Sequence, residues 1–235
     1  MGGSILAQVH RQIGDECPDI DAESMKNLYR AMIQLKREGK ILAYHDKSAG
    51  GLMATLSEMA FASHAGLNID LSSICANTKE VNLHKALFNQ EAGIVIQISS
   101  EDRIKIREML YEYNIGSHII ARPQFVDDPN ICVHLAGEVV FKDKTAELHK
   151  IWSTVSDKIR MQRENPETVQ SESEVVHDYS RKAIKYKSTF DVSQHPAHKI
   201  IADYNTQEKA KPKVAILRAP GTNGDQEMAN KFMMA

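Results

Sequence analysis

The sequence predicts an α/β fold, an α+β arrangement in which helices pack on a mixed sheet. Short alternating or β-branched apolar runs recur through the first 143 residues, and amphipathic helical segments separate them. After residue 143 a long helical pattern and then a polar stretch follow. We therefore expect an α/β domain over 1–143, a long helix with a polar connector over 144–211, and the truncated start of a second domain over 212–235.

The first two expected helices flank a short strand. Residues 22–38 place apolar side chains at helical spacing, Asp21 can cap their first amides, and Gly39 is suited to ending the helix. Residues 41–44 favour a strand, and residues 52–64 favour a second helix.

Further along, Gly66 is expected to end the second helix, and a turn is expected at residues 116–117. Ala136 and Gly137 form a hairpin signal between two apolar runs. The remaining expected elements are strands over 67–71, 93–98, 118–121, 131–135 and 138–141, and a helix over 101–113.

The segment after residue 143 is expected to differ from the domain before it. Residues 144–165 read as one long helix that Pro166 stops, and 167–211 as a polar connector or a partly disordered segment. Residues 213–218 are a buried-strand signal, 219–225 a glycine-containing turn, and 226–235 the start of a helix. One strand and part of a helix are too little to bury a core, so the chain is expected to stop soon after a second domain begins.

Composition and charge narrow the functional classes. The formal net charge of −2 argues against nucleic-acid binding, which favours a strongly basic protein. The sequence has no run of about 20 apolar residues and no secretory signal at its start. The cysteines Cys17, Cys75 and Cys132 are scattered, as expected for reduced thiols in a cytoplasmic protein.

The most informative motif is HDKSAGGL at residues 45–52, between an expected strand and an expected helix. A helix start offers unpaired amides and the positive end of the helix dipole, which favour phosphate. Gly50 and Gly51 let a backbone approach a ligand, Ser48 can donate to phosphate, and Asp46 offers an oxygen ligand suited to Mg²⁺. The alternative is a simple helix start in which Ser48 caps, the glycines turn the chain, and Asp46 is solvated.

Several segments resemble phosphoribosylformylglycinamidine synthases of the large single-chain form. Residues 45–52 and LSEMAFA at 56–62 are similar to HDRSDGGL and LAEMAFA of that family. Further similar segments follow in the same order as in the family. They are residues 2–9 with 14–15, LFNQEAG at 87–93, 152–153, 161–167, KVAILR at 213–218 and GTNG at 221–224.

The resemblance implies a fold and a function for each part. Residues 1–143 resemble the last synthase domain, which is similar to the C-terminal domain of aminoimidazole ribonucleotide synthetase-type proteins. Residues 212–235 resemble the opening of the glutamine amidotransferase domain. The family converts formylglycinamide ribonucleotide to its amidine with ATP and glutamine-derived ammonia, in purine biosynthesis. The synthase region of the family contains two related halves, and residues 1–143 resemble the last domain of the second half. That half is implied to hold an auxiliary ATP or ADP with Mg²⁺, for which Asp46 matches a metal ligand and Ser48 a nucleotide contact.

The sequence departs from the family pattern around the motif. Ala49 stands in place of an aspartate and Lys47 in place of an arginine, so Asp46 is the only acid of the loop. Gln90 stands in place of a glutamate, which leaves Glu91 as the acid there; a solvated carboxylate at a strand start explains Glu91 equally well.

No catalytic residue is assigned within this chain. The cysteines precede residue 212, so none is the nucleophile that the resemblance implies for glutamine hydrolysis. We expect the isolated chain to perform neither reaction, and a non-catalytic nucleotide-binding or interaction module is the alternative function. The face toward the missing domains of the same enzyme is expected to be apolar and capable of self-association.

Overall fold

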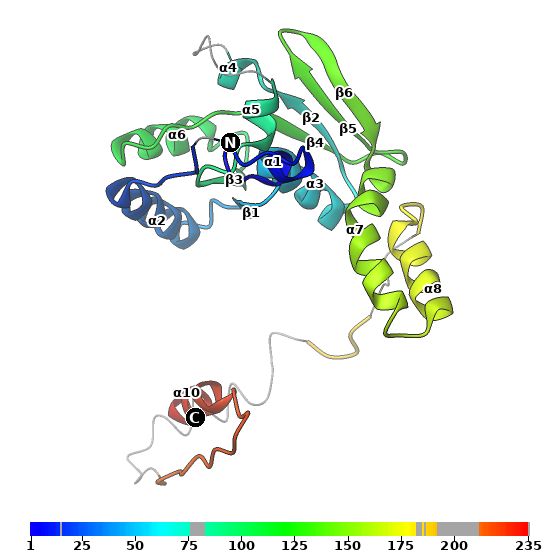
Figure 1. Cartoon of the computed structure of the whole chain (residues 1–235). Coiled ribbons are helices and arrows are strands. Elements are labelled where there is room, and N and C mark those ends of the chain that lie inside the picture. The colour runs from blue at the N-terminus through cyan, green and yellow to red at the C-terminus, as the bar shows by residue number, and fades with distance from the viewer. Residues whose placement is uncertain (15, 76–82, 182–184, 186, 192–211, 235) are drawn as a thin grey trace. The chain divides into compact units, whose positions relative to one another are not determined.

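The computed structural model describes residues 1–14, 16–75, 83–181, 185, 187–191 and 212–234. The described chain falls into two compact units, Met1–Lys182 and Ala183–Ala235. The elements of the first unit are α1 Ile5–Val9, α2 Ala22–Arg37, β1 Ala43–Lys47, α3 Gly51–Ser63, β2 Gly66–Asp70, α4 Ser72–Cys75, α5 Leu83–Phe88, β3 Gly93–Gln97, α6 Arg103–Glu112, β4 Ala121–Gln124, β5 Asn130–Leu135, β6 Glu138–Lys144, α7 Thr145–Met161 and α8 Pro166–His177 (Figure 1).

The strands form two sheets, one of them mixed. β1 pairs antiparallel with β3, and the second sheet has the strand order β4-β2-β5-β6. β2 and β5 run parallel, whereas β2 with β4 and β5 with β6 are antiparallel. Parallel and antiparallel pairs in one sheet, with helices packed on it, confirm the predicted α/β fold class.

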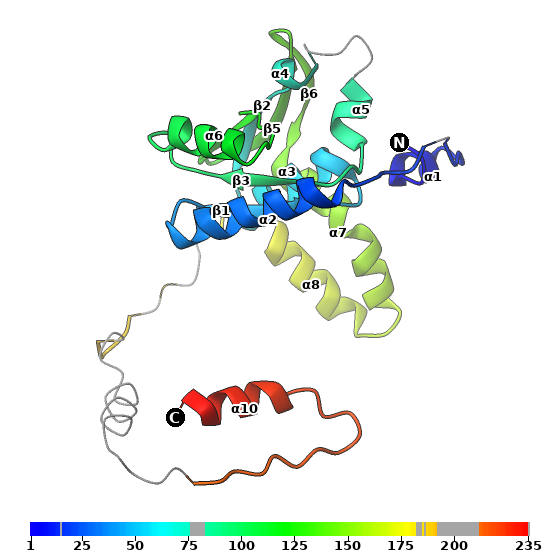
Figure 2. The same ribbon diagram turned by 90° about the vertical axis from the view of Figure 1, so that its left-hand side faces the viewer.

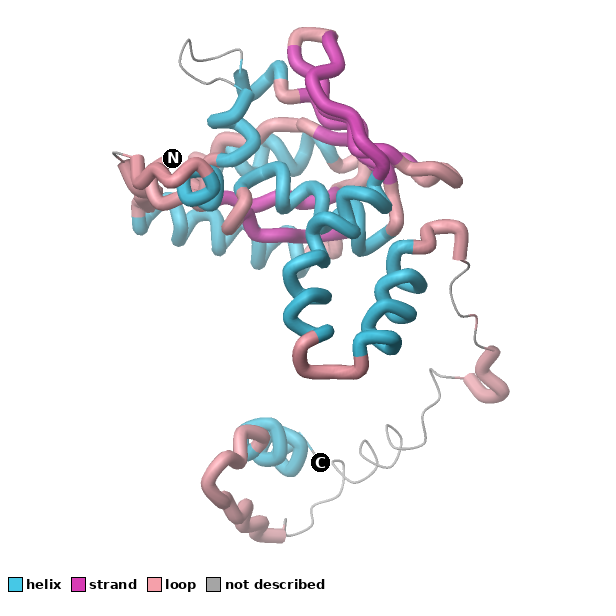
Figure 3. Tube along the Cα trace, turned by 45° about the vertical axis from the view of Figure 1, so that its right-hand side comes forward, coloured by secondary structure: helices cyan, strands magenta, loops and turns pink. Residues whose placement is uncertain are grey.

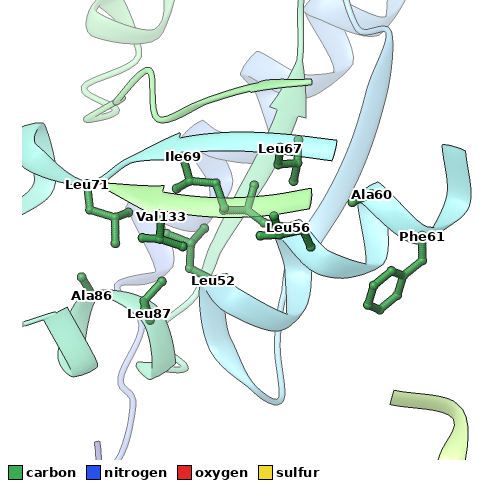
Figure 4. Packing of buried hydrophobic residues seen from close by; sticks show 11 residues of the cluster. Leu52, Leu56, Ala60, Phe61, Leu67, Ile69, Leu71, Ala86, Leu87 and Val133 are labelled. Carbon is green, nitrogen blue, oxygen red and sulfur yellow. The ribbon is translucent and has the colours of Figure 1, made fainter. Parts of the chain in front are cut away.

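The larger core lies between α3 and the four-stranded sheet. Figure 4 shows the leucines of α3 pointing toward side chains of β2 and β5, with Ala86 and Leu87 of α5 beside them. Ile69 and Val133, from neighbouring strands, are both fully buried. This packing fixes α3 and therefore its first turn, where the glycine motif lies.

A smaller core joins α2 and α6 to the two-stranded sheet. Leu35 of α2 and Ile106 of α6 are buried together, and Ile96 of β3 packs against them. Figure 2 shows both helices running beside β1 and β3. The Asp21 carboxylate accepts a hydrogen bond from Ser24 N and Gly39 follows α2 with a φ of +66°, so the expected start and end of this helix are confirmed.

Helices α7 and α8 form an antiparallel hairpin, visible in Figure 3 as two neighbouring cyan helices. The Thr145 hydroxyl at the start of α7 donates to Ala65 O at 3.2 Å, which ties this helix to the sheet end of the domain. The expectation that Pro166 ends the helix was wrong in position. α7 ends at Met161, and Pro166 is the first residue of α8, where a missing amide hydrogen costs no hydrogen bond.

Several expected boundaries shift in the structure. α3 ends where His64 adopts a left-handed backbone, and Gly66 instead begins β2. A glycine fits at this position because a Cβ would lie 2.8 Å from Asn130 O. β1 and β4 begin later than expected, at Ala43 and Ala121. The turn after α6 lies at residues 113–114, where Asn114 has a positive φ, and not at 116–117.

The second unit has one described helix, α10 Asp225–Met234, which confirms the expected helix start. The expected strand over 213–218 was wrong, because the described residues of this unit offer it no strand partner. Leu217 in that segment is 90% exposed, so the residues are not a buried strand. Residues 192–211 of the expected connector lie outside the described residues, and the domain limits at 143 and 211 remain predictions. None of the described helices combines the length and hydropathy that crossing a membrane requires.

Candidate functional site

The candidate site is the turn between β1 and α3. β1 ends at Lys47 and α3 begins at Gly51, so only three residues connect them. Gly50 is the residue before the helix and has a left-handed backbone with a φ of +84°, and no side chain caps the helix start. Gly51 N donates to Ser48 O at 2.9 Å, which closes the turn. The turn therefore lies at the positive end of the α3 dipole.

Gly51 is needed for packing as well as for its backbone conformation. A Cβ at this position would lie 2.7 Å from the carbonyl oxygens of Leu87 and Asn89. Its φ of +66° is also unfavourable for a residue with a side chain. The turn thus packs against the end of α5 and the residue after it, which is a reason for the glycine that the motif alone did not reveal.

Asp46 and Ser48 both lie at the exposed side of the turn. Tyr44 precedes Asp46 by two residues on β1, so the two side chains share a face, and the tyrosine hydroxyl donates to Asp46 Oδ1 at 2.5 Å. Burial and this carboxylate raise the pKa of Tyr44 to about 12, so the tyrosine keeps its hydrogen at neutral pH. Among the described residues the Ser48 hydroxyl has no hydrogen-bond partner, which leaves it available to a ligand.

The residues after α5 support the turn from behind. With its amide oxygen facing the two donors, Gln90 accepts hydrogen bonds from Gly50 N at 2.9 Å and from Ile5 N at 3.0 Å. Lys47 Nζ donates to Asn89 Oδ1 at 2.9 Å and so is held against this segment. Burial lowers the pKa of Lys47, and the charge of Glu91 opposes that shift.

Gln90 and Tyr44 are therefore supporting residues that the motif analysis did not assign. Tyr44 was detectable in principle, because it precedes Asp46 by two positions on an expected strand. Gln90 lies far from the motif in sequence, and only the folded chain brings it to Gly50.

The oxygen donors near the turn suit a metal ion that is held jointly by the protein and a nucleotide better than one held by protein side chains alone. Within the described part of the chain, no three histidine, cysteine, aspartate or glutamate side chains come together as metal ligands. Asp46 is thus a single carboxylate on an exposed face, and Mg²⁺ is commonly held by one or two carboxylates together with nucleotide phosphates and water. The residues present fit such a magnesium–nucleotide complex.

A groove of about 680 Å³ lies elsewhere, over one face of α2. Arg30 and Arg37 of that helix line it together with Tyr113, which follows α6. None of the four predicted site residues, Asp46, Ser48, Gly50 and Gly51, contributes to this groove, so it is separate from the candidate site.

Comparison with solved structures supports the fold. Thermotoga maritima PurL complexed with FGAR has a TM-score of 0.50 and 19% identity, covering 57% of this chain and 23% of that one. The same protein complexed with ATP has a TM-score of 0.50 and 13% identity, covering 77% of this chain and 25% of that one. Identities this low establish a shared fold and no shared residue roles.

The sequence comparisons give a higher identity than the solved structures do. It is 39% identical over 235 residues to the phosphoribosylformylglycinamidine synthase of Schizosaccharomyces pombe, which confirms the resemblance found in the motifs. The alignment takes in 99% of this chain and 17% of that protein, so the chain spans about one sixth of this relative's length. Residues 1–124 match the family described as AIR synthase related protein, C-terminal domain. The chain therefore belongs to the AIR synthase related family, and its residues 1–124 are the C-terminal domain of that family.

Proposed function

We propose that this chain is part of an ATP-dependent carbon–nitrogen ligase of purine biosynthesis. That ligase converts formylglycinamide ribonucleotide to formylglycinamidine ribonucleotide with ammonia taken from glutamine. The observation that carries the proposal is the 39% identity to a phosphoribosylformylglycinamidine synthase along nearly the whole chain. In this proposal residues 1–143 form a synthase domain and residues 212–235 begin a glutamine amidotransferase domain. Residues 144–211 connect the two.

Within that enzyme the β1–α3 turn would hold an auxiliary magnesium–nucleotide complex, ATP or ADP. Asp46 would bind Mg²⁺, Ser48 would donate a hydrogen bond to phosphate, and Gly50 and Gly51 would shape the turn that the nucleotide approaches. The uncapped start of α3 and the exposed, tyrosine-bonded Asp46 carboxylate support this assignment. When bound, Mg²⁺ supplies neutralising charge to the phosphates; Tyr44 holds one Asp46 oxygen, and Gln90 fixes Gly50.

The proposed role assigns positioning and binding to this chain and no catalytic step. Cys17, Cys75 and Cys132 are free thiols, and all precede the proposed amidotransferase segment. We therefore expect the purified chain to form no amidine and to hydrolyse no glutamine. Detection of either product by chromatography would contradict this assignment, whereas nucleotide binding without turnover would agree with it.

The partners in this proposal are adenine nucleotide and the other domains of the same enzyme, in the cytoplasm, with neither nucleic acid nor a membrane. α7 offers a surface for such domains, because Ile151, Val155 and Ile159 repeat every four residues and are 68%, 67% and 48% exposed. Self-association through this apolar stripe is expected when the stripe is uncovered. Sedimentation of the chain at rising concentration tests this, and a strict monomer would contradict it.

Calorimetric titration with ADP and Mg²⁺ tests the proposed site. We expect saturable, magnesium-dependent binding that Asp46→Ala abolishes, because the variant removes the only carboxylate of the turn. Asp127→Ala is the matched control, since it removes another exposed aspartate from a different loop, and it should bind like the parent. Equal binding by Asp46→Ala, or no binding by the parent chain, would contradict a nucleotide site in this chain.

A further inference from the structure

One carboxylate joins β1, the strand before the candidate turn, to helix α7. Glu58, in the middle of α3, has its Oε2 2.7 Å from Nε2 of His45, the residue just before Asp46. The indole Nε1 of Trp152 on α7 donates to the other oxygen, Oε1, at 2.8 Å. Both oxygens of Glu58 are therefore used, one by the strand that carries the candidate site and one by a helix beyond residue 124, where the family match ends.

The His45 ring is held at both of its nitrogens. Nδ1 lies 2.9 Å from the backbone oxygen of Asp46, and Nε2 faces Glu58. Each ring nitrogen therefore lies within hydrogen-bond distance of an oxygen atom. The ring thus connects the Asp46 backbone to the Glu58 carboxylate through two short contacts.

The indole is itself fixed by aromatic neighbours. The Trp152 ring lies 6.0 Å from the Phe61 ring of α3 and 5.9 Å from the His149 ring of α7, in tilted arrangements. His149 in turn stacks on Phe61 at 4.6 Å. Although Trp152 is 56% exposed, its polar end is therefore held in place against α3.

We propose that Glu58 and Trp152 are positioning residues, through whose contacts α7 sets the orientation of His45 and Asp46 before the β1–α3 turn. We call this linkage the bracing. The bracing follows from the contacts alone, whereas its effect on ligand binding rests on the proposed magnesium–nucleotide site. Because the Trp152 indole holds one oxygen of Glu58 and His45 contacts the other, removing the indole donor leaves the carboxylate freer to move and so weakens its hold on His45.

Amide hydrogen exchange of the ligand-free chain tests the bracing. Trp152→Phe keeps an aromatic ring against Phe61 and removes the indole donor, and Ile151→Ala is the control on the same helix. We expect exchange at residues 45–51 to become about fivefold faster in Trp152→Phe and to stay unchanged in Ile151→Ala, as loss of one net hydrogen bond implies. Denaturation of both variants separates local loosening from a general loss of stability. Unchanged exchange in Trp152→Phe, or equal acceleration in the control, would overturn the bracing.

Fluorescence tests the link to ligand. Trp152 is the only tryptophan of the chain, so its emission reports on this one position. We expect ADP with Mg²⁺ to shift the emission of the parent chain, and Glu58→Ala to lose the shift. Binding measured by calorimetry without a shift in the parent chain would overturn the coupling. Absence of calorimetric binding would contradict the proposed nucleotide site, while the exchange experiment would still decide the bracing.

Discussion

β2 and the segment over residues 213–218 are both short apolar runs, but they differ in their surroundings. β2 lies between β4 and β5, and its Ile69 is completely buried. Residues 213–218 have no strand partner among the described residues, and Leu217 is 90% exposed. Since an apolar run buries its side chains only when other strands and a helix cover it, the difference shows that partners decide the structure of such a run.

The largest expected effect is a loss of stability that differs between these two regions. Ile69→Ala should lower the free energy of unfolding by about 4 kcal/mol, because it opens a cavity in the core under α3. Leu217→Ala should change it by less than about 0.5 kcal/mol, because the side chain is already in water. Urea denaturation followed by circular dichroism measures both. A comparable loss of stability in the two variants would contradict the claim that only the first region is packed into a core.

The next largest effect concerns the packing of the candidate turn. Gly51→Ala should cost about 3 kcal/mol, combining an unfavourable positive φ with overpacking against two carbonyl oxygens. Gly39→Ala is the matched control, because Gly39 has the same φ of +66° and nothing near the position of a Cβ. It should cost only about 1 kcal/mol in the same denaturation assay. Equal losses would show that the turn is not pressed against residues 87–89.

A smaller effect is expected in α8, which folds within a segment of polar sequence. The Asn165 side chain accepts hydrogen bonds from Glu167 N at 2.9 Å and Thr168 N at 3.3 Å. Asn165→Ala should therefore cost about 1 kcal/mol, as is usual for loss of a helix cap. Ser171→Ala, on the exposed part of the same helix, is the control and should have little effect. Full stability in Asn165→Ala would mean that α8 does not contribute to the folded unit.

The smallest expected effect is a pH dependence where α8 meets α7. Burial lowers the pKa of His149, and neighbouring histidines add to the shift. The groups that face it are Tyr179, whose hydroxyl lies 3.2 Å from Nδ1, and His64, His177 and Asp157.

Because the folded-state pKa of His149 lies below the ordinary value of about 6.5, its contribution to stability is complete above that pH. As pH falls below it, the unfolded chain takes up the proton more readily, and the free energy of unfolding should decrease. Denaturation at pH 7.5 and 5.5 measures this, and His149→Phe should show a flatter dependence. An unchanged slope in that variant would assign the pH dependence to other groups.

Much of the fold could be predicted from local sequence signals. The cap at Asp21, the helical spacing through residues 52–64 and the Ala136–Gly137 turn each act within a few residues, so the sequence alone reveals them. The pairing of β2 with β5 joins residues more than sixty positions apart, and no local pattern specifies it.

The misses share a physical cause, which is dependence on a distant partner. α8 lies in the segment predicted to be a polar connector, because few of its residues are apolar, yet Val169 is fully buried and His177 nearly so. The four residues of the candidate site were readable from one motif. Their support by Gln90, Glu58 and Trp152 depends on contacts that only the folded chain creates.

The central claim is that the β1–α3 turn binds a magnesium–nucleotide complex, and amide NMR spectra during titration with ADP and Mg²⁺ test it most directly. We expect the largest shifts at Asp46, Ser48, Gly50 and Gly51, and we expect them to disappear in Asp46→Ala. Shifts confined to another surface, such as the α2 groove, or no shifts at saturating ligand, would contradict it.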